Sequence, residues 1–212
     1  MILVIGCKGS MGKRYAAILQ YLDMNFDGID KNSNITMDSL RRYDAFILAT
    51  PTETHFHYLM TLIPLGKPIL VEKPVVTEMD QLEMVYRVAD MYKTPITMMN
   101  QYVKLELKGS KGLSSYNYYH SGNDGLTWDC IQIIGLADGA VSIHDDSPIW
   151  GCVINGHKIS KSDMDEAYVS FVQEWLNNPH FQDRGKILEA HSKTIKLLEA
   201  YESSAHCYSS SQ

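Results

Sequence analysis

Apolar runs alternate with amphipathic segments from residue 1 to about residue 100. Such alternation is typical of parallel strands joined by crossover helices. The segment from Thr77 onward has helical periodicity, and Asp80, three residues later, is expected to complete a capping box at its start. The predicted strands are MILVI (1–5), FDGID (26–30), DAFILAT (44–50), PILVE (68–72) and PITMMN (95–100). This part of the chain is therefore predicted to be an α/β domain with a doubly wound parallel sheet.

The pattern changes after residue 101. Strand-like runs now follow one another, and the last is expected to turn at Asn155–Gly156, a favoured hairpin dipeptide. Helices are expected over 124–136, after an N-cap at Ser162, and over 185–202. The predicted strands are VKLEL (103–107), SSYNYYH (114–120), AVSIHD (140–145) and IWGCVIN (149–155). These runs predict a reduced antiparallel sheet in an α+β arrangement.

The chain of 212 residues is longer than a typical domain and too short for two full-sized ones. We therefore predict an α/β domain over 1–101 and a second, reduced α+β domain for substrate binding or oligomerisation over 102–212. A content of 45% hydrophobic and 21% charged residues is that of a soluble globular protein.

A net charge of −6 argues against nucleic acid as the main partner, because phosphate binding needs clustered Lys and Arg. No apolar run approaches the roughly 20 residues of a membrane span, and no signal-cleavage pattern follows the first apolar run, so a cytoplasmic location is expected. The cysteines Cys7, Cys130, Cys152 and Cys207 are far apart, without metal-ligand spacing, and no metal is predicted.

The glycine loop directly after the first predicted strand carries the first candidate chemistry. Gly6 permits a tight turn, Gly9 lets the backbone approach a pyrophosphate, and Gly12 lets helix and strand pack closely. The helix that follows presents unpaired N–H groups and partial positive charge at its N-terminus. We therefore expect a Rossmann-type site for a nicotinamide dinucleotide, which makes 1–101 a dinucleotide-binding domain. Its predicted contacts in this loop are Gly6, Lys8, Gly9, Ser10, Met11 and Gly12.

An acidic residue ends the second predicted strand, where an adenosine ribose is expected. Asp30 lies eighteen residues after Gly12 and can accept hydrogen bonds from the ribose hydroxyls, which favours NAD. Lys31 and Lys8 are close enough in sequence to offset repulsion of a 2′-phosphate, so NADP stays open.

Two further motifs follow the loop at fixed intervals: Ala49-Thr50-Pro51-Thr52-Glu53-Thr54-His55 and Gly66-Lys67-Pro68-Ile69-Leu70-Val71-Glu72-Lys73-Pro74. Together with the glycine loop and the strand-end acid, they resemble the Gfo/Idh/MocA family, the relatives of glucose-fructose oxidoreductase and inositol dehydrogenase. The segments 165–179 and 187–204 are similar to the helices that end this family's chains. The resemblance implies an NAD(P)-dependent oxidoreductase acting on a sugar, cyclitol or related hydroxyl or carbonyl compound.

The lysine of the second motif is the main catalytic candidate. Lys73 ends a predicted buried strand beside Glu72, near the expected nicotinamide. A positively charged ring and partial burial should lower the pKa of its ammonium toward the range useful for proton transfer. The resemblance implies that role for the lysine of this motif. Pro74 restricts the preceding residues to an extended path and permits a cis bond.

The resemblance also implies an Asp on a second-domain helix, with a His four residues on. Asp124 matches the Asp, but Trp128 stands where the His is expected. Asp124 or Asp129 could assist Lys73, or His120 could enter from the preceding strand. A helix N-cap is an equally simple role for Asp124.

Other residues are expected along the cofactor channel. Thr50 and Pro51 match family positions that line it, and His55 is expected to begin the next helix beside it. Asn100, at the end of the fifth predicted strand, is expected to border the nicotinamide or substrate. The predicted cofactor contacts outside the glycine loop are Asp30, Lys31, Ala49, Thr50, Pro51, His55, Glu72, Lys73 and Asn100.

Two functions are compatible with these residues. The first is hydride transfer between a nicotinamide cofactor and a sugar-like small molecule, since the cofactor carries the hard chemistry and the protein positions it. The second is a non-catalytic dinucleotide-binding or regulatory module, favoured by the absent histidine. A homo-oligomer that completes the site is a further expectation.

Overall fold

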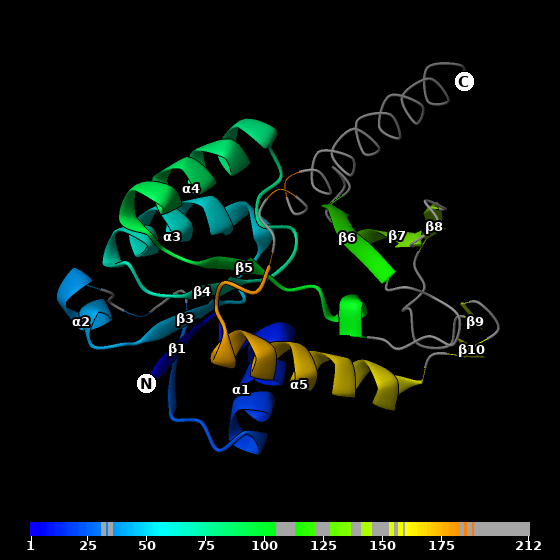
Figure 1. Ribbon diagram of the computed structural model, residues 1–212, viewed down its shortest axis with the longest axis horizontal. Helices are drawn as coiled ribbons and strands as arrows, with labels where there is room; N and C mark the ends of the chain where they lie inside the picture. The colour runs from blue at the N-terminus through cyan, green and yellow to red at the C-terminus, as the bar shows by residue number, and fades with distance from the viewer. Residues whose placement is uncertain are drawn as a thin grey trace.

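The computed structural model of the protein describes residues 1–30, 33, 36–104, 113–121, 128–136, 141–145, 153–154, 157–158, 160–182, 185 and 188. The first half forms a parallel five-stranded sheet in the order β2-β1-β3-β4-β5 (Figure 1). Each strand coincides with one of the five predicted apolar runs, which confirms the doubly wound Rossmann-type domain. The strands are β1 (Ile2–Ile5), β2 (Phe26–Ile29), β3 (Ala45–Leu48), β4 (Ile69–Val71) and β5 (Ile96–Met98).

Helices connect these strands. The α-helices are α1 (Ser10–Tyr21), α2 (Met37–Arg41), α3 (His55–Leu62), α4 (Met79–Tyr92) and α5 (Lys161–Asn177). Short 3-10 turns are η1 (Thr52–Thr54), η2 (Ile63–Leu65) and η3 (Gln101–Lys104). The chain runs from β1 to β2 toward one edge of the sheet and from β3 to β4 toward the other. The carboxyl ends of β1 and β3 therefore border a crevice, which is the usual ligand position in such sheets.

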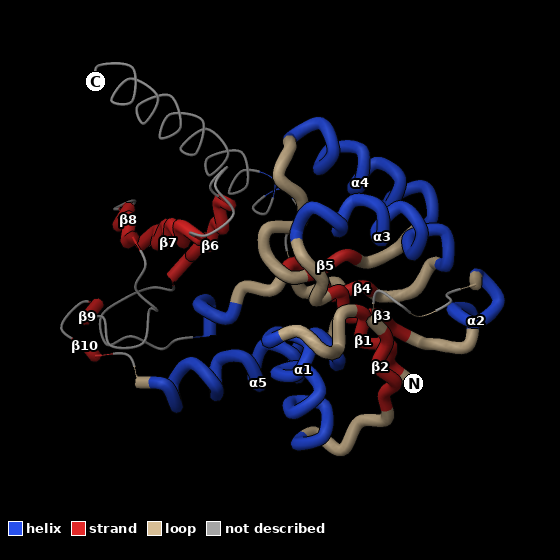
Figure 2. Tube along the Cα trace, turned by 180° about the vertical axis from the view of Figure 1, so that it is seen from behind, coloured by secondary structure: helices blue, strands red, loops and turns tan. Residues whose placement is uncertain are grey.

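Alternate strand residues divide the core into two apolar layers, as the two-residue repeat of a strand requires. Val4 and Ile47 pack in one layer with side chains of α1 and α5. Leu3 and Leu48 pack in the other with side chains of α2, α3 and α4. Figures 1 and 2 show the two sets of helices on opposite sides of the sheet. Both faces are therefore covered.

Helix α5 comes from the second half of the chain yet packs on the Rossmann sheet beside α1. Its buried Phe171 and Trp175 belong to the same apolar layer as Tyr15 and Leu19 of α1. The helix begins two residues earlier than predicted, because its N-cap is Ser160 and not Ser162. The Ser160 hydroxyl accepts from the Asp163 N–H at 3.0 Å, and the Asp163 carboxylate accepts from the Ser160 N–H at 2.6 Å. The division into domains at residue 101 stays a prediction.

The other described elements are strands, of which only the backbone is described. They are β6 (Leu113–Ser121), β7 (Trp128–Leu136), β8 (Val141–Asp145), β9 (Val153–Ile154) and β10 (His157–Lys158). Antiparallel pairing joins β6, β7 and β8 in this order, and β9 with β10. The β9–β10 pair flanks Asn155–Gly156, which confirms the predicted hairpin.

The predicted helix over 124–136 is wrong for residues 128–136, which form β7. This segment contains Trp128, Ile131, Ile133 and Ile134, and aromatic and β-branched residues favour a pleated strand with partners on both sides. The tyrosine-rich β6 and the following β8 supply those partners.

Three smaller predictions also change. Val103 and Lys104, predicted as the start of a strand, lie in the 3-10 turn η3. Helix α4 has Glu78 at its N-cap and no side-chain cap, so the capping box at Thr77 is wrong. Of the helix predicted over 185–202, only residues 185 and 188 lie in the described part, both helical. No helix among the described residues is long and apolar enough to cross a membrane.

Candidate functional site

The glycine loop joins β1 to α1 at the carboxyl edge of the sheet. Gly6 has a φ of +88°, and a Cβ there would lie 2.6 Å from the Ala49 carbonyl oxygen. A Cβ on Gly12 would lie 2.1 Å from the Gly6 carbonyl oxygen, so no larger residue fits. A Cβ on Gly9 would approach this oxygen only to 3.4 Å. The turn and the close helix–strand approach predicted from sequence are therefore present.

Gly9 is the N-cap of α1, and no side chain caps the helix. The first N–H groups of an α-helix have no partner within the helix, and the helix dipole adds partial positive charge. Gly9, Ser10 and Met11 line a cavity of about 730 Å³, within the range of roughly 300–1,000 Å³ typical of ligand pockets. An uncapped helix start facing such a cavity fits the pyrophosphate of a dinucleotide.

Asp30 follows β2 directly, as predicted. Its carboxylate accepts a hydrogen bond from the Lys8 backbone N–H at 3.1 Å, which ties the strand end to the glycine loop. Its own N–H donates to the Ser33 hydroxyl at 3.2 Å. Lys31 lies outside the described residues. The strand-end acid is thus fixed beside the loop that would hold the pyrophosphate.

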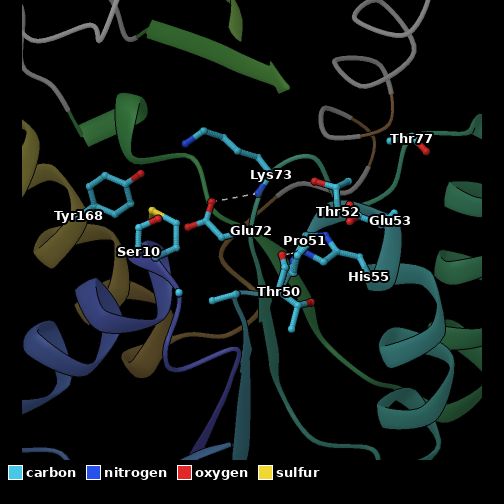
Figure 3. Close-up of a pocket in the computed structure, with 13 residues that line it drawn as sticks. Ser10, Thr50, Pro51, Thr52, Glu53, His55, Glu72, Lys73, Thr77 and Tyr168 are labelled. Carbon is cyan, nitrogen blue, oxygen red and sulfur yellow. Dashed lines mark hydrogen bonds between the residues drawn. The ribbon is translucent and has the colours of Figure 1, made fainter. Parts of the chain in front are cut away.

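The cavity extends from the glycine loop to the ends of β3 and β4. Ten further residues line it: Ala49, Thr50, Pro51, Thr52, Glu53, His55, Glu72, Lys73, Thr77 and Tyr168. Figure 3 shows Lys73 between Tyr168 on one side of the cavity and His55 on the other. Both family-like motifs therefore meet the glycine loop around a single space.

Lys73 is buried at the end of β4, with 6% of its surface exposed. Its Nζ donates to Gln101 Oε1 at 2.5 Å and lies 5.7 Å from the centre of the Tyr168 ring. The Lys73–Pro74 peptide bond is cis. The side chain that sequence reasoning singled out thus lies at the carboxyl edge of the sheet, in the wall of the cavity.

Glu72 is also buried, and both of its carboxylate oxygens are bound. Tyr15 of α1 donates to Oε1 at 2.5 Å, and the Lys73 backbone N–H donates to Oε2 at 3.2 Å. Burial first, and then the neighbouring Glu72 carboxylate, raise the pKa of Tyr15 well above 10, so its hydroxyl remains a donor. Glu72 thereby joins the helix of the glycine loop to the backbone that carries Lys73.

His55 begins α3, as predicted, and is fully buried. Its Nε2 lies 2.8 Å from the Thr50 carbonyl oxygen, and its Nδ1 lies 3.0 and 3.1 Å from those of Pro74 and Val75. Burial lowers the pKa of His55, although the three carbonyl contacts oppose this shift. The ring therefore links the loop after β3 to the loop after β4, besides lining the cavity.

Five residues of this region were not among the predicted site residues. Thr52, Glu53, Thr77 and Tyr168 line the cavity, and Gln101 holds the Lys73 ammonium. Tyr168 lies within the apolar helical repeat of α5, a spacing typical of a core residue, and its ring also lies 4.5 Å from the Arg14 guanidinium. The position of Gln101 directly after Asn100, at the end of a strand beside β4, was the available signal.

The remaining predicted residues of the site are Asn100, Asp124, His120 and Asp129. Asn100 is 7% exposed and is not among the residues that line the cavity. Its Oδ1 is buried and accepts no hydrogen bond within the part of the chain described. Asp124 lies outside the described residues. His120 in β6 and Asp129 in β7 stand directly opposite each other in the strand register.

The fold and this cavity define an NAD(P)-binding protein of Rossmann type. Residues 22–99 match the family described as "Oxidoreductase family, NAD-binding Rossmann fold", which is Gfo/Idh/MocA. Residues 22–99 of this Rossmann domain are therefore similar to the Gfo/Idh/MocA oxidoreductase family. This match bears out the predicted resemblance and the predicted class of cofactor, a nicotinamide dinucleotide.

Solved structures share this fold at low sequence identity. GenD2 from gentamicin A biosynthesis in complex with NAD is 13% identical, with a TM-score of 0.64 and coverage of 92% of this chain and 91% of that chain. A Gfo/Idh/MocA family oxidoreductase from Vibrio cholerae is 14% identical, with a TM-score of 0.62 and 99% of each chain covered. A putative myo-inositol dehydrogenase from Sinorhizobium meliloti 1021 is 13% identical, with a TM-score of 0.59, covering 90% and 93%. None of the curated proteins matches the chain.

Proposed function

We propose that the protein transfers a hydride between NAD or NADP and a hydroxyl or carbonyl carbon of a sugar, cyclitol or related compound, with Lys73 as the proton-transfer group. The observation that carries the proposal is that the buried Lys73 lines the same cavity as the uncapped start of α1. A dinucleotide spanning this cavity would place its pyrophosphate at one end and its nicotinamide near the lysine.

The bound nicotinamide would supply the hydride chemistry. The chain's own part begins at the glycine loop, where backbone N–H groups of α1 would hold the phosphates. Lys73 would then accept the hydroxyl proton during oxidation, or donate a proton to the carbonyl oxygen during reduction. Glu72 accepts a hydrogen bond from the Lys73 backbone, and the His55 ring contacts the carbonyl oxygen of the neighbouring Pro74. These contacts limit the position of the lysine relative to the substrate.

The sugar or cyclitol class is supported by the family resemblance, which implies such substrates. It is also supported by the similar fold of a putative myo-inositol dehydrogenase. Asp124, Asp129 and His120 remain proposed assistants to Lys73. Of these, His120 and Asp129 occupy directly opposed positions on neighbouring antiparallel strands. Lys31 and Asn100 remain proposed cofactor contacts, together with the cavity-lining residues of the two motifs.

The deciding experiment is a turnover assay of the purified protein over a panel of sugars, cyclitols and their keto forms, following the absorbance of NADH or NADPH. Lys73→Met should lower kcat by about 10² to 10⁴, the usual contribution of a positioned acid or base. Its dinucleotide affinity should stay within a few-fold of wild type. Lys13→Met, on the exposed side of α1, is the matched control and should leave kcat unchanged.

A second function, dinucleotide binding without catalysis, is favoured by one observation: residues 128–136, which were predicted to belong to the helix that carries the family's histidine, form the strand β7. In that case the protein would bind NAD or NADP, no compound of the panel would be turned over, and Lys73→Met would change nothing. The proposed homo-oligomer is tested separately by light scattering, where a monomeric mass would contradict it.

A further inference from the structure

Gln101 is the buried side chain in contact with the proton-transfer candidate. It is the first residue of η3, three residues after the end of β5. Strand β5 is the parallel neighbour of β4, so the residues that follow the two strands meet at one edge of the sheet. Gln101 is 1% exposed, and its Oε1 lies 2.5 Å from Lys73 Nζ. The Gln101 side chain is therefore held in place by a hydrogen bond that its amide oxygen accepts from the Lys73 ammonium.

Resting on the proposed function, we propose that Gln101 is the positioning residue of this reaction: its amide oxygen holds the Lys73 ammonium in the cavity wall and releases the lysine to the substrate. A long lysine side chain has considerable rotamer freedom. A hydrogen bond from a second strand end removes much of it before the substrate binds. The Tyr168 ring on α5 lies on the lysine as well, with 5.7 Å between Nζ and the ring centre.

The chemical type of the partner matters as much as its position. A carboxylate within about 4–6 Å of an ammonium strongly favours the charged form, whereas an amide oxygen accepts a hydrogen bond without adding charge. A glutamine can therefore fix the lysine and still allow it to lose its proton. The same place occupied by a glutamate would hold the ammonium charged.

Within the described part of the chain, other ionisable groups near the lysine come from the end of β4, from α1 and from α5. Glu72 precedes it on the β4 end, and its carboxylate is bound by the Tyr15 hydroxyl and by the Lys73 N–H. Tyr15 and Arg14 are on α1, and Tyr168 is on α5 with the Arg14 guanidinium over its ring. These groups are unchanged in variants at position 101, so a change in lysine titration would report on Gln101 itself.

Two variants act in opposite directions on the lysine. Gln101→Glu places a carboxylate at the ammonium and should raise the pKa of Lys73 by about 1 to 3. Gln101→Leu removes the acceptor from a buried ammonium and should lower this pKa. General damage to the site would not separate the two variants in this manner.

The test is competitive labelling of the amines with trace acetic anhydride, with the Lys73 peptide quantified by mass spectrometry across the pH range around the ordinary lysine pKa of about 10.4. At a fixed pH below that value, labelling of Lys73 should fall at least about tenfold in Gln101→Glu and rise in Gln101→Leu. Gln20→Glu, which adds the same charge on the exposed side of α1, should match wild type. Lys73 labelling that is unchanged, or that moves the same way in both variants, would overturn the proposal.

If Gln101→Leu does not fold, Gln101→Glu against Gln20→Glu decides alone, because unchanged Lys73 labelling in Gln101→Glu would still overturn the assignment. The labelling needs no substrate, so it separates this inference from the proposed function. Opposite labelling changes without turnover of any panel compound would support Gln101 and contradict hydride transfer. Turnover by wild type with unaltered labelling in both variants would support hydride transfer and contradict Gln101. Where turnover is found, the pH profile of kcat in Gln101→Glu should move to higher pH.

Discussion

The Tyr15 hydroxyl donates a hydrogen bond to the Glu72 carboxylate, and both side chains are buried. Tyr15 lies on the helix that follows the glycine loop, whereas Glu72 precedes the lysine at the end of β4. The contact therefore joins the part of the cavity suited to a pyrophosphate with the part that carries the proton-transfer candidate. Because the pKa of Tyr15 is raised well above 10, this donor persists throughout the neutral pH range.

Removing this hydroxyl should destabilise the domain. Tyr15→Phe leaves a buried carboxylate without one of its donors, and a hydrogen bond to a charged group contributes about 1.5–3 kcal/mol. Urea unfolding should show a loss of that order in the free energy of unfolding. Tyr21→Phe on the same helix, at a residue 78% exposed, should show almost none. Equal stability of the two variants would mean that the Tyr15–Glu72 contact does not hold the helix to the strand.

The glycines of the loop should differ in what they tolerate. A Cβ on Gly12 would lie 2.1 Å from a backbone oxygen, so Gly12→Ala forces helix and strand apart and should cost about 1–3 kcal/mol or more. Gly9→Ala meets nothing closer than 3.4 Å and should fold with nearly wild-type stability. Because Gly9 lines the cavity, its new methyl group should still weaken NAD binding by about tenfold.

Thermal unfolding with and without NAD separates these effects. Gly12→Ala should unfold at a lower temperature in the absence of NAD. Gly9→Ala should match wild type without NAD and gain less from its addition, since the stabilisation by a ligand rises with the logarithm of its concentration relative to its Kd. If Gly9→Ala gains as much as wild type, the dinucleotide does not approach this backbone.

The sequence predicted the parallel sheet well because each buried strand is a short apolar run between segments of helical period. Lys73 and the glycine loop were predictable for a related reason: both follow directly from strand ends, and parallel strands bring their carboxyl ends to one edge. The motif residues Thr50, Pro51 and His55 reach the same cavity in the same way.

Other parts of the site depend on contacts between distant segments. Tyr168 has the spacing of a core residue on α5, and only the packing of α5 beside α1 brings it to the cavity. Gln101 carries no motif: its position after Asn100 indicated the correct edge of the sheet, but its bond to Lys73 depends on side-chain packing that the sequence does not show. Residues 128–136 were predicted as part of a helix, whereas pairing with β6 and β8 produced a strand.

The buried ring of His55 should make the stability of the fold pH-dependent. Its pKa in the folded protein lies below its ordinary value because burial disfavours the charged ring. On acidification below about pH 6.5 the unfolded chain then takes up a proton more readily than the folded one, so stability falls with falling pH. The slope is at most about 1.4 kcal/mol per pH unit, the value for one proton taken up on unfolding.

His55→Gln should remove this slope, at the cost of about 1–3 kcal/mol at neutral pH, because buried carbonyl oxygens lose the ring that contacts them. His57→Gln, an exposed residue of the same helix, should keep both the slope and the stability of wild type. The measurement is urea unfolding at one pH near neutrality and one about a unit and a half below it. If His55→Gln loses stability on acidification as steeply as wild type, the ring is not held neutral by burial. In that case a charged imidazole, which donates a hydrogen bond from each nitrogen, links the loops after β3 and β4.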